Sequence, residues 1–196
     1  MSQTLIIQAH PDPKSFNAQL AQRYADAMQK TGHTATILSL GALDFDPVLR
    51  AGFSDQQALE PDLQRAQALI KEAKHLVWVY PTWWGHWPAL LKGFIDRVFL
   101  PGWAFKNTGK ALPEPLLKGR TARILSTMDS PWWWYWLAHG RAGHRALKHA
   151  TLQYVGVRTI GQDTLYKHRT KTPQALEAWL QHIETLAQRD AGRLAG

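Results

Sequence analysis

The sequence predicts an α/β protein in which helices cover both faces of one open, parallel β-sheet. Its 196 residues fit a single domain that spans positions 1–196. Apolar residues make up 45% of the chain and charged residues 19%, a composition that can form a buried core. Short apolar runs alternate five times with segments of helical periodicity, which is typical of parallel sheets built from strand–helix–strand units.

The five predicted strands are short apolar runs rich in β-branched residues. They lie at 4–9, 34–40, 75–81, 120–128 and 157–165. The run HLVWVYP at 75–81 is apolar on both faces, so we expect it in the centre of the sheet.

The five predicted helices follow these strands in turn. They lie at 17–30, 61–74, 87–99, 142–156 and 172–189. Pro61 and Pro88 stand in the first turns of two of them, where proline is tolerated, and Thr172 is a suitable N-cap for the last. Residues 41–60 and 100–119 are expected to be irregular.

The composition also indicates where the protein is expected in the cell and which kinds of ligand it could bind. The chain has no cysteine, which excludes disulfides and Cys-based metal sites, and we expect no metal. No apolar run approaches the length that spans a bilayer, and the N-terminus lacks the pattern of a secretory signal. We therefore expect a soluble cytoplasmic protein without stable membrane insertion. The net charge of +8 favours an anionic ligand, and a solvated basic surface is the alternative.

Ligands of open parallel sheets bind beyond the carboxyl ends of the strands, where three unusual loops occur here. The first holds His10, Ser15, Phe16 and Asn17 immediately before a helix. It is no dinucleotide or P-loop fingerprint, because the required glycines are absent. Hydroxyl, amide and helix N-terminal N–H groups can bind a phosphate, although Ser15 and Asn17 could instead act only as helix caps.

The loop after the third strand crowds Trp83, Trp84 and Trp87 between two prolines, with Gly85 to let the chain turn. Apolar walls and backbone N–H donors suit a flat aromatic ligand. The alternatives are burial in the core or in a subunit interface.

The loop after the fourth strand, SPWWWYWLAHG at 130–140, has four tryptophans and a tyrosine. Such a patch would be a liability on a monomer, so it walls a pocket, packs against another subunit or touches a membrane surface.

Two groups of charged residues are expected to have no direct role in ligand binding or catalysis. Lys92 and Asp96 are spaced to pair on one helix, and we interpret them, with Arg97, as structural. Arg120 and Arg123 precede the carboxyl end of their strand and are expected to be solvated.

Two motifs carry a resemblance to a known family. At HPDPKSFN (10–17) and YPTWWGHWPALLKGFIDRVF (80–99) the sequence resembles the NAD(P)H:quinone oxidoreductases of the flavodoxin-like superfamily, which include the bacterial modulators of drug activity and the potassium-efflux ancillary proteins. The resemblance covers almost the whole chain. It implies a flavodoxin-like sheet with strand order 2-1-3-4-5.

The resemblance also implies one bound FAD or FMN per chain, with NAD(P)H as the reductant. By that likeness, the phosphate would be held by His10, Ser15, Phe16 and Asn17. The isoalloxazine would be held by Pro81, Thr82, Trp83, Trp84 and Gly85. The family works by ping-pong hydride transfer through flavin N5 to a quinone or a nitro- or azo-aromatic acceptor.

The sequence departs from the family after the fourth strand. Many relatives have Thr-Thr-Gly-Gly there, whereas this chain has Ser126, Thr127, Met128 and Asp129, which are still expected at the cofactor. Tyr135 and His139 are the nearest matches to the family's catalytic pair, and His144 is interpreted as a helix N-terminal residue. The acceptor is expected between Trp103, Phe105, Trp132 and Trp133.

The family's site forms between subunits, so the resemblance implies a homodimer. The alternative function is a regulatory flavoprotein that docks to a membrane potassium-efflux transporter, with reductase activity secondary. Nucleic-acid binding is not expected, because no recognition motif is present and the aromatic residues gather at strand ends.

Overall fold

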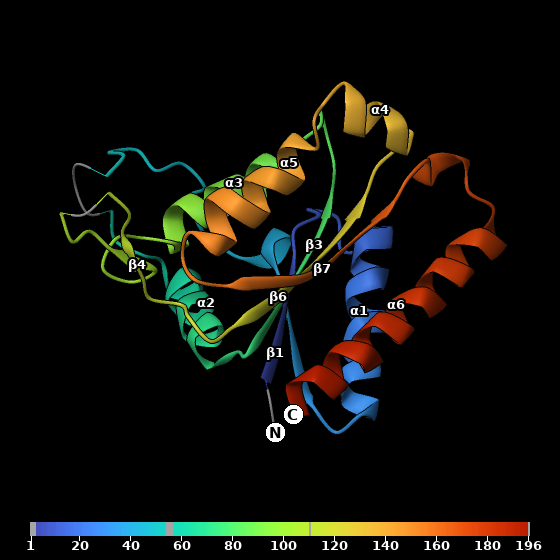
Figure 1. Cartoon of the computed structure of the whole chain (residues 1–196), viewed down its shortest axis with the longest axis horizontal. Helices are drawn as coiled ribbons and strands as arrows, with labels where there is room; N and C mark the ends of the chain where they lie inside the picture. Colours follow the sequence, from blue (N-terminus) through green and yellow to red (C-terminus); the bar gives the residue numbers. More distant parts are fainter. Residues whose placement is uncertain (1–2, 54–56, 110, 196) are drawn as a thin grey trace.

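The computed structural model describes residues 3–53, 57–109 and 111–195. A five-stranded parallel sheet runs through its centre in the order β2-β1-β3-β6-β7 (Figure 1). The strands are β1 (Gln3–Gln8), β2 (Thr34–Ser39), β3 (His75–Pro81), β6 (Thr121–Thr127) and β7 (Arg158–Leu165). This confirms the predicted fold class and the predicted strand order.

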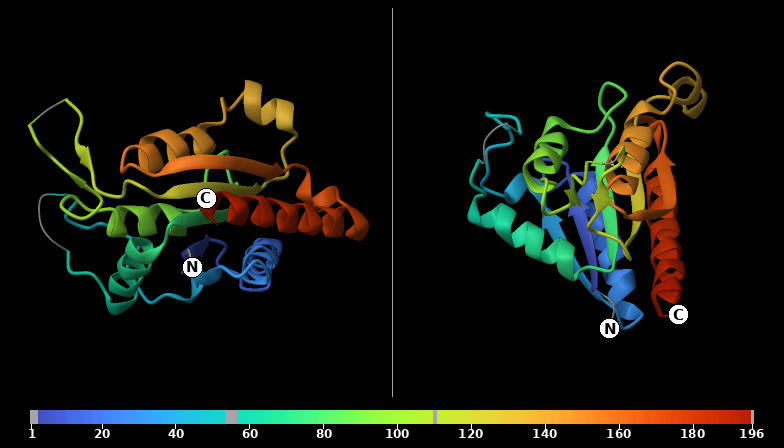
Figure 2. Two further views of the ribbon diagram at one scale, coloured as in Figure 1. Left: turned by 60° about the horizontal axis from the view of Figure 1, so that its bottom comes forward. Right: turned by 60° about the vertical axis from the view of Figure 1, so that its left-hand side comes forward.

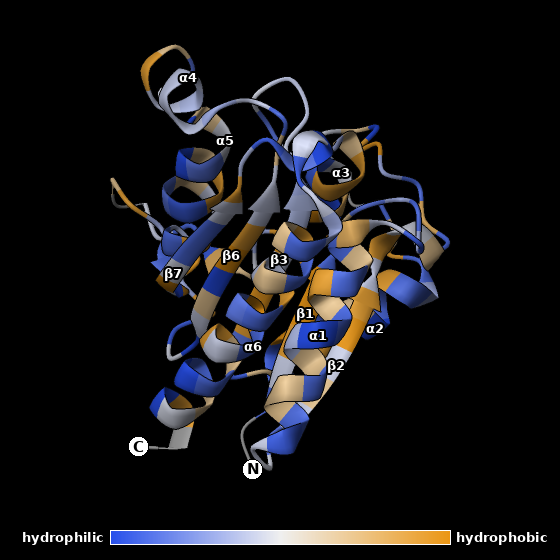
Figure 3. Ribbon diagram, turned by 90° about the vertical axis from the view of Figure 1, so that its right-hand side faces the viewer, coloured by the Kyte–Doolittle hydropathy of each residue, from blue (hydrophilic) through white to orange (hydrophobic). Residues whose placement is uncertain are grey.

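Helices cover both faces of the sheet, as Figure 2 shows. One face carries α1 (Phe16–Lys30) and α6 (Pro173–Ala195), which lie side by side in Figure 3. The other face carries α2 (Pro61–Glu72), α3 (Ala89–Val98) and α5 (Ala142–Arg145), the last continued by π-helical turns over Ala146–Gln153. The described part of the chain has no helix that is long and apolar enough to cross a membrane.

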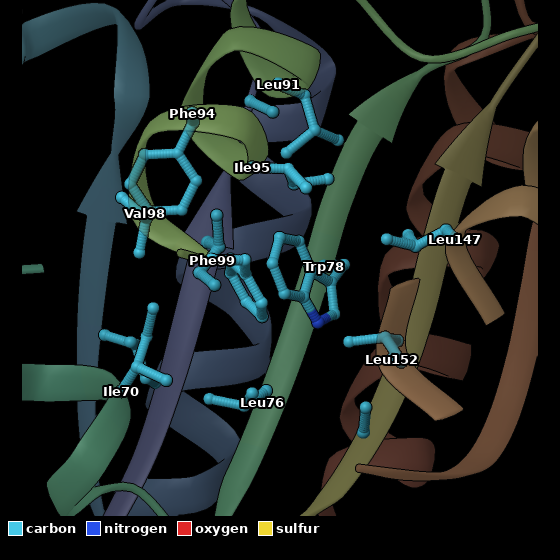
Figure 4. Packing of buried hydrophobic residues seen from close by; sticks show 14 of the residues in the cluster. Ile70, Leu76, Trp78, Leu91, Phe94, Ile95, Val98, Phe99, Leu147 and Leu152 are labelled. Atoms are coloured by element: carbon cyan, nitrogen blue, oxygen red, sulfur yellow. The ribbon is translucent and has the colours of Figure 1, made fainter. Parts of the chain in front are cut away.

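The strand predicted to be central, β3, is buried along its whole length. Trp78 is fully buried and packs against Phe99, with 6.0 Å between the ring centroids. Figure 4 shows Trp78 between α3 and the π-helical segment that carries Leu147 and Leu152. This core holds the end of β3, and with it the tryptophan loop, in a defined position.

Three segments differ from the sequence expectation. The loop at 130–140 contains a short helix, α4 (Trp132–Leu137), which was not predicted because a run of five aromatic residues has no helical periodicity. The irregular segment 100–119 contains two short paired strands, β4 (Phe105–Lys106) and β5 (Glu114–Pro115). The last helix begins at the predicted position and extends to Ala195, past the predicted end at 189.

The expectation that Arg123 is solvated is wrong. Its guanidinium is buried and bonds to the carboxylates of Asp190 on α6 and Asp163 on β7. Arg120 is half-buried and donates to the carbonyl oxygens of Ile70 and Lys71, the latter at 2.6 Å. These partners lie far away in the sequence, so the pattern around the arginines did not reveal them.

The structural interpretation of the α3 charges agrees with the contacts. Lys92 Nζ lies 2.6 Å from both carboxylate oxygens of Asp96. The buried guanidinium of Arg97 binds Glu60 Oε2 at 2.8 Å and the carbonyl of Ala58 at 2.7 Å. Arg97 thereby ties α3 to the segment that precedes α2.

Candidate functional site

A cavity of about 310 Å³ opens at the carboxyl ends of β1, β3 and β6. This is the edge at which ligands of doubly wound sheets bind. Most of the residues predicted to hold a cofactor line it, from three separate loops. They are His10, Ser15, Phe16, Asn17, Pro81, Thr82, Trp83, Thr127, Met128 and Asp129.

The N-terminus of α1 forms one wall. Ser15 is the N-cap, and its hydroxyl accepts from the N–H of Ala18 at 3.3 Å. The first N–H groups of a helix have no partner within the helix, so this wall presents donors and the positive end of the helix dipole. The side chain of Asn17 is buried and donates to Thr127 Oγ1 at 3.0 Å.

His10 lies on the same side of the cavity. Its Nδ1 accepts from the N–H of Asp12 at 3.0 Å, and its ring meets Trp83 edge-on at 5.5 Å. Burial lowers the pKa of His10, against the opposing effect of Asp12, so the ring is neutral at pH 7. A neutral imidazole that accepts at Nδ1 carries its proton on Nε2 and can donate from there.

The loop after β3 turns at Gly85 as expected, but the turn is tight and uses backbone N–H groups that were expected to be free for a ligand. Trp83 and His86 exchange both backbone hydrogen bonds, at 2.8 and 2.9 Å. The two residues at the tip, Trp84 and Gly85, have φ angles of +52° and +77°. Positive φ at both central positions is typical of a type I′ turn. The N–H groups of Thr82 and Trp83 are therefore already engaged, the former with the carbonyl of Thr127 at 2.7 Å.

Three of the residues predicted at the cofactor do not line the cavity. Trp84 is fully exposed at the tip of the turn, and Gly85 lies beside it. Ser126 is buried, with its hydroxyl 2.9 Å from both His144 Nε2 and Thr164 Oγ1. Its side chain points to the opposite face of β6 from Thr127, because neighbouring side chains of a strand alternate.

Three residues that line the cavity, Asp12, His168 and Arg169, were not predicted from the sequence. His168 and Arg169 follow β7, and the ring of His168 lies 5.1 Å from that of Phe16. Arg169 is exposed and its Nε pairs with Asp129 Oδ2 at 3.0 Å. The basic run LYKHRTKTP at 165–173 was a visible signal, but the position of the run beside the first loop was not.

Three buried polar atoms of the lining residues have no partner within the described residues: Asn17 Oδ1, Thr82 Oγ1 and His168 Nε2. Unpaired buried polar atoms are costly, and those that line a cavity can be satisfied by a bound ligand or water. Together with the helix N-terminus and Arg169, they fit a ligand with polar edges and an anionic group, such as a flavin nucleotide.

Tyr135 and His139 lie together outside the cavity. Tyr135 is buried, its hydroxyl accepts from the N–H of His144 at 3.3 Å, and burial raises the pKa of Tyr135. The exposed His139 packs over the turn, since a Cβ on Gly85 would come within 2.6 Å of His139 Nδ1.

The four predicted acceptor-site residues do not meet within one chain. Trp103 lines a different cavity of about 690 Å³ beside Leu49 and Phe53. Phe105 packs against Tyr154 at 5.1 Å. Trp132 lines a third cavity with Trp179, and Trp133 is exposed on α4.

No cluster of His, Asp and Glu that could hold a metal ion is present among the residues that the structure describes.

Comparisons with known proteins agree with this fold. A family described by its flavodoxin-like fold matches residues 2–187. The human ribosyldihydronicotinamide dehydrogenase [quinone] is 26% identical over 210 residues, covering 93% of this chain and 90% of the human protein. A solved protein of Streptococcus mutans superposes with a TM-score of 0.82 at 27% identity, covering 95% of this chain and 99% of that one.

A further solved structure shows the same fold. An FMN-dependent NADH-azoreductase of Bacillus anthracis, solved in complex with FMN, superposes with a TM-score of 0.74 at 21% identity. All of both chains is covered.

Proposed function

The chain belongs to the flavodoxin-like family, and on this premise we propose that it is a flavin-dependent NAD(P)H oxidoreductase acting on quinones or on nitro- or azo-aromatic compounds. Relatives whose names state a quinone dehydrogenase activity and align over almost the whole chain support this activity. The observation that carries the proposal is the cavity at the carboxyl edge, where unpaired polar atoms meet a helix N-terminus and Arg169.

The lining residues divide into two groups by chemistry. Ser15 and the first backbone N–H groups of α1, that of Asn17 among them, would hold the phosphate, with charge supplied by Arg169 and a donor by His10. Pro81, Thr82 and Trp83 would hold the ring system from the side of β3, and Met128 and Asp129 from the side of β6. When bound, FAD or FMN would supply two-electron transfer between NAD(P)H and the acceptor in two separate half-reactions.

The protein contributes apolar contact and exclusion of water at one side of the cavity. Met128 is almost completely buried, and Trp83 is held edge-on by His10. We propose His139 as the proton donor to the reduced acceptor, because its ring is exposed beside the turn. Tyr135 would join it only if its hydroxyl left the N–H of His144, and otherwise it positions the segment that carries His139.

We further propose a homodimer. Trp103 and Phe105 lie away from the cavity of their own chain, so they can wall an acceptor site only by reaching the cavity of a second copy. Trp132 and Trp133 on α4 would then border the entrance. Sedimentation velocity should show a dimer, and a stable monomer with full activity would refute this part.

The first test is the identity of the cofactor. The purified protein should be yellow, and denaturation should release one flavin per chain, which chromatography then identifies as FAD or FMN. Arg169→Gln removes the exposed cation at the cavity and should lower the affinity for flavin. Arg145→Gln removes the same charge outside the cavity and should leave the affinity unchanged. A colourless protein that takes up neither FAD nor FMN would refute the proposal.

A further inference from the structure

Helix α4 exposes an unusual amount of tryptophan. Four of its six residues are Trp, with exposed fractions between 47% and 60%, and only Tyr135 is buried. Leu137 at its end is 82% exposed. Figures 1 and 2 both show α4 at an extremity of the molecule, beyond the carboxyl ends of the strands. An exposed patch of this kind marks an interaction surface.

Cations lie on two sides of α4. The guanidinium of Arg141 stands 4.1 Å from the ring centroid of Trp136. Arg145 and Lys148 line a small pocket together with Arg141. On the other side, Lys167 and Lys171 line a cavity of about 610 Å³ together with Trp132.

Very little negative charge opposes these cations. Residues 130–176 contain seven Lys and Arg and one acidic residue, a net +6, and of the seven only Arg158 lies at the opposite end of β7 from α4. The one acid, Asp163, pairs with the buried Arg123. The carboxylate just before the segment, Asp129, pairs with Arg169. The surface around α4 is therefore apolar at its tip and positive at its base.

We propose that α4, with Arg141, Arg145, Lys148, Lys167 and Lys171, docks on the surface of an anionic lipid bilayer. Tryptophan prefers the boundary between headgroups and acyl chains, because its ring is apolar and its N–H needs a polar partner. Basic residues beside such a segment are attracted by anionic headgroups. The helix lies on the membrane and does not cross it.

A second copy of the chain fits this surface less well. In a two-fold contact whose axis passes through α4, Arg141, Lys167 and Lys171 would lie against their own copies. Like charges placed opposite one another oppose association, and no unpaired carboxylate among the described neighbours of α4 offsets them. Charge complementarity therefore selects an anionic surface.

Docking would also orient the molecule. Helix α4 begins three residues after Asp129, which lines the candidate cavity. The cavity edge would then face the lipid, where apolar aromatic compounds concentrate.

The test is co-sedimentation of the purified full chain with vesicles. We expect binding to vesicles of phosphatidylcholine mixed with phosphatidylglycerol, little binding to phosphatidylcholine alone, and weakening by salt. The Trp134→Ser/Trp136→Ser double variant should lower the partition coefficient about tenfold, and Lys171→Glu/Arg145→Glu at least as much.

Two matched controls test whether the effect belongs to α4. Leu112→Ser removes an exposed apolar side chain near β5, and Lys30→Glu reverses an exposed charge at the end of α1. Both should bind like the unmodified protein. Thermal melts of all variants confirm that each is folded, and sedimentation velocity reports their oligomeric state.

Three results would overturn the proposal. The first is unchanged vesicle binding by folded α4 variants. The second is dissociation of an oligomer by Trp134→Ser/Trp136→Ser without any loss of lipid binding, which would assign α4 to a subunit contact. The third is binding to native membranes but not to protein-free anionic vesicles, which would indicate a membrane protein as the partner. None of these results depends on whether the chain holds a flavin.

Discussion

The replacement Asp190→Asn should strongly destabilise the fold, although it lies far from the candidate site. Asp190 is fully buried on α6 and accepts from Tyr24 Oη at 2.8 Å and from Arg123 Nη2 at 2.8 Å. Its side chain also lies 3.6 Å from His75 Nε2. Asparagine has nearly the same shape but no charge, so the buried guanidinium of Arg123 would keep only Asp163 as a charged partner.

The size of the effect follows from the burial of the pair. Removing one partner of a buried ion pair costs about 3–5 kcal/mol, because the remaining charge stays desolvated. A domain of this size has a total free energy of unfolding of about 5–15 kcal/mol. The expected fall in the midpoint of thermal unfolding is about 6–20 °C.

Urea unfolding monitored by circular dichroism measures this change directly. Glu177→Gln is the matched control, because Glu177 forms an exposed ion pair with Arg23 and its loss should cost less than about 1 kcal/mol. Burial would raise the pKa of Asp190, but contacts with Arg123, His75 and Tyr24 together keep it well below its usual range. The stabilisation by Asp190 is therefore present at neutral pH and is lost as the pH falls below about 4. The two stability curves should therefore converge in acid. An Asp190→Asn variant within 1 kcal/mol of the unmodified protein at pH 7 would refute the reasoning.

Three further predictions concern other parts of the molecule. Asn17→Leu keeps the branching and the number of side-chain heavy atoms but removes the bond to Thr127 and the free Oδ1, so flavin affinity measured by fluorescence titration should fall about tenfold; an unchanged affinity would exclude Asn17 as a ligand contact. Burial lowers the pKa of His144 to about 4, so the unfolded chain takes up a proton first as the pH falls. The titration of His144 should thus lower the free energy of unfolding by about 2 kcal/mol between pH 7 and pH 5. In His144→Gln this loss should be absent, as measured by urea unfolding at both pH values. Gly93→Ala would place a Cβ 2.5 Å from Pro47 O, so it should cost about 1–3 kcal/mol in urea unfolding, whereas Gly192→Ala, where a Cβ meets nothing within 4 Å, should not destabilise.

Composition and periodicity along the chain were sufficient for the fold class and the order of its elements. The run HLVWVYP is apolar at every position, and burial on both faces follows directly from that, so β3 could be placed in the centre of the sheet. The helix starts at Pro61 and Pro173 could also be predicted from the sequence, because proline and cap residues act on their immediate neighbours. The loops at the carboxyl edge could be predicted to border a cavity, because the carboxyl ends of parallel strands meet at one edge of the sheet.

Contacts between residues far apart in the sequence could not be predicted, because such contacts leave no local pattern. Arg123 looks like a surface residue until α6 brings Asp190 to it, and His168 reaches the cavity only through the path of the chain after β7. Trp83 and Trp84 are identical neighbours in the sequence, yet a turn with positive φ places the first at the cavity and leaves the second in solvent. Which tryptophan lines the candidate cavity is decided by the tertiary structure, because the residue type supplies the indole ring and the backbone conformation sets its direction.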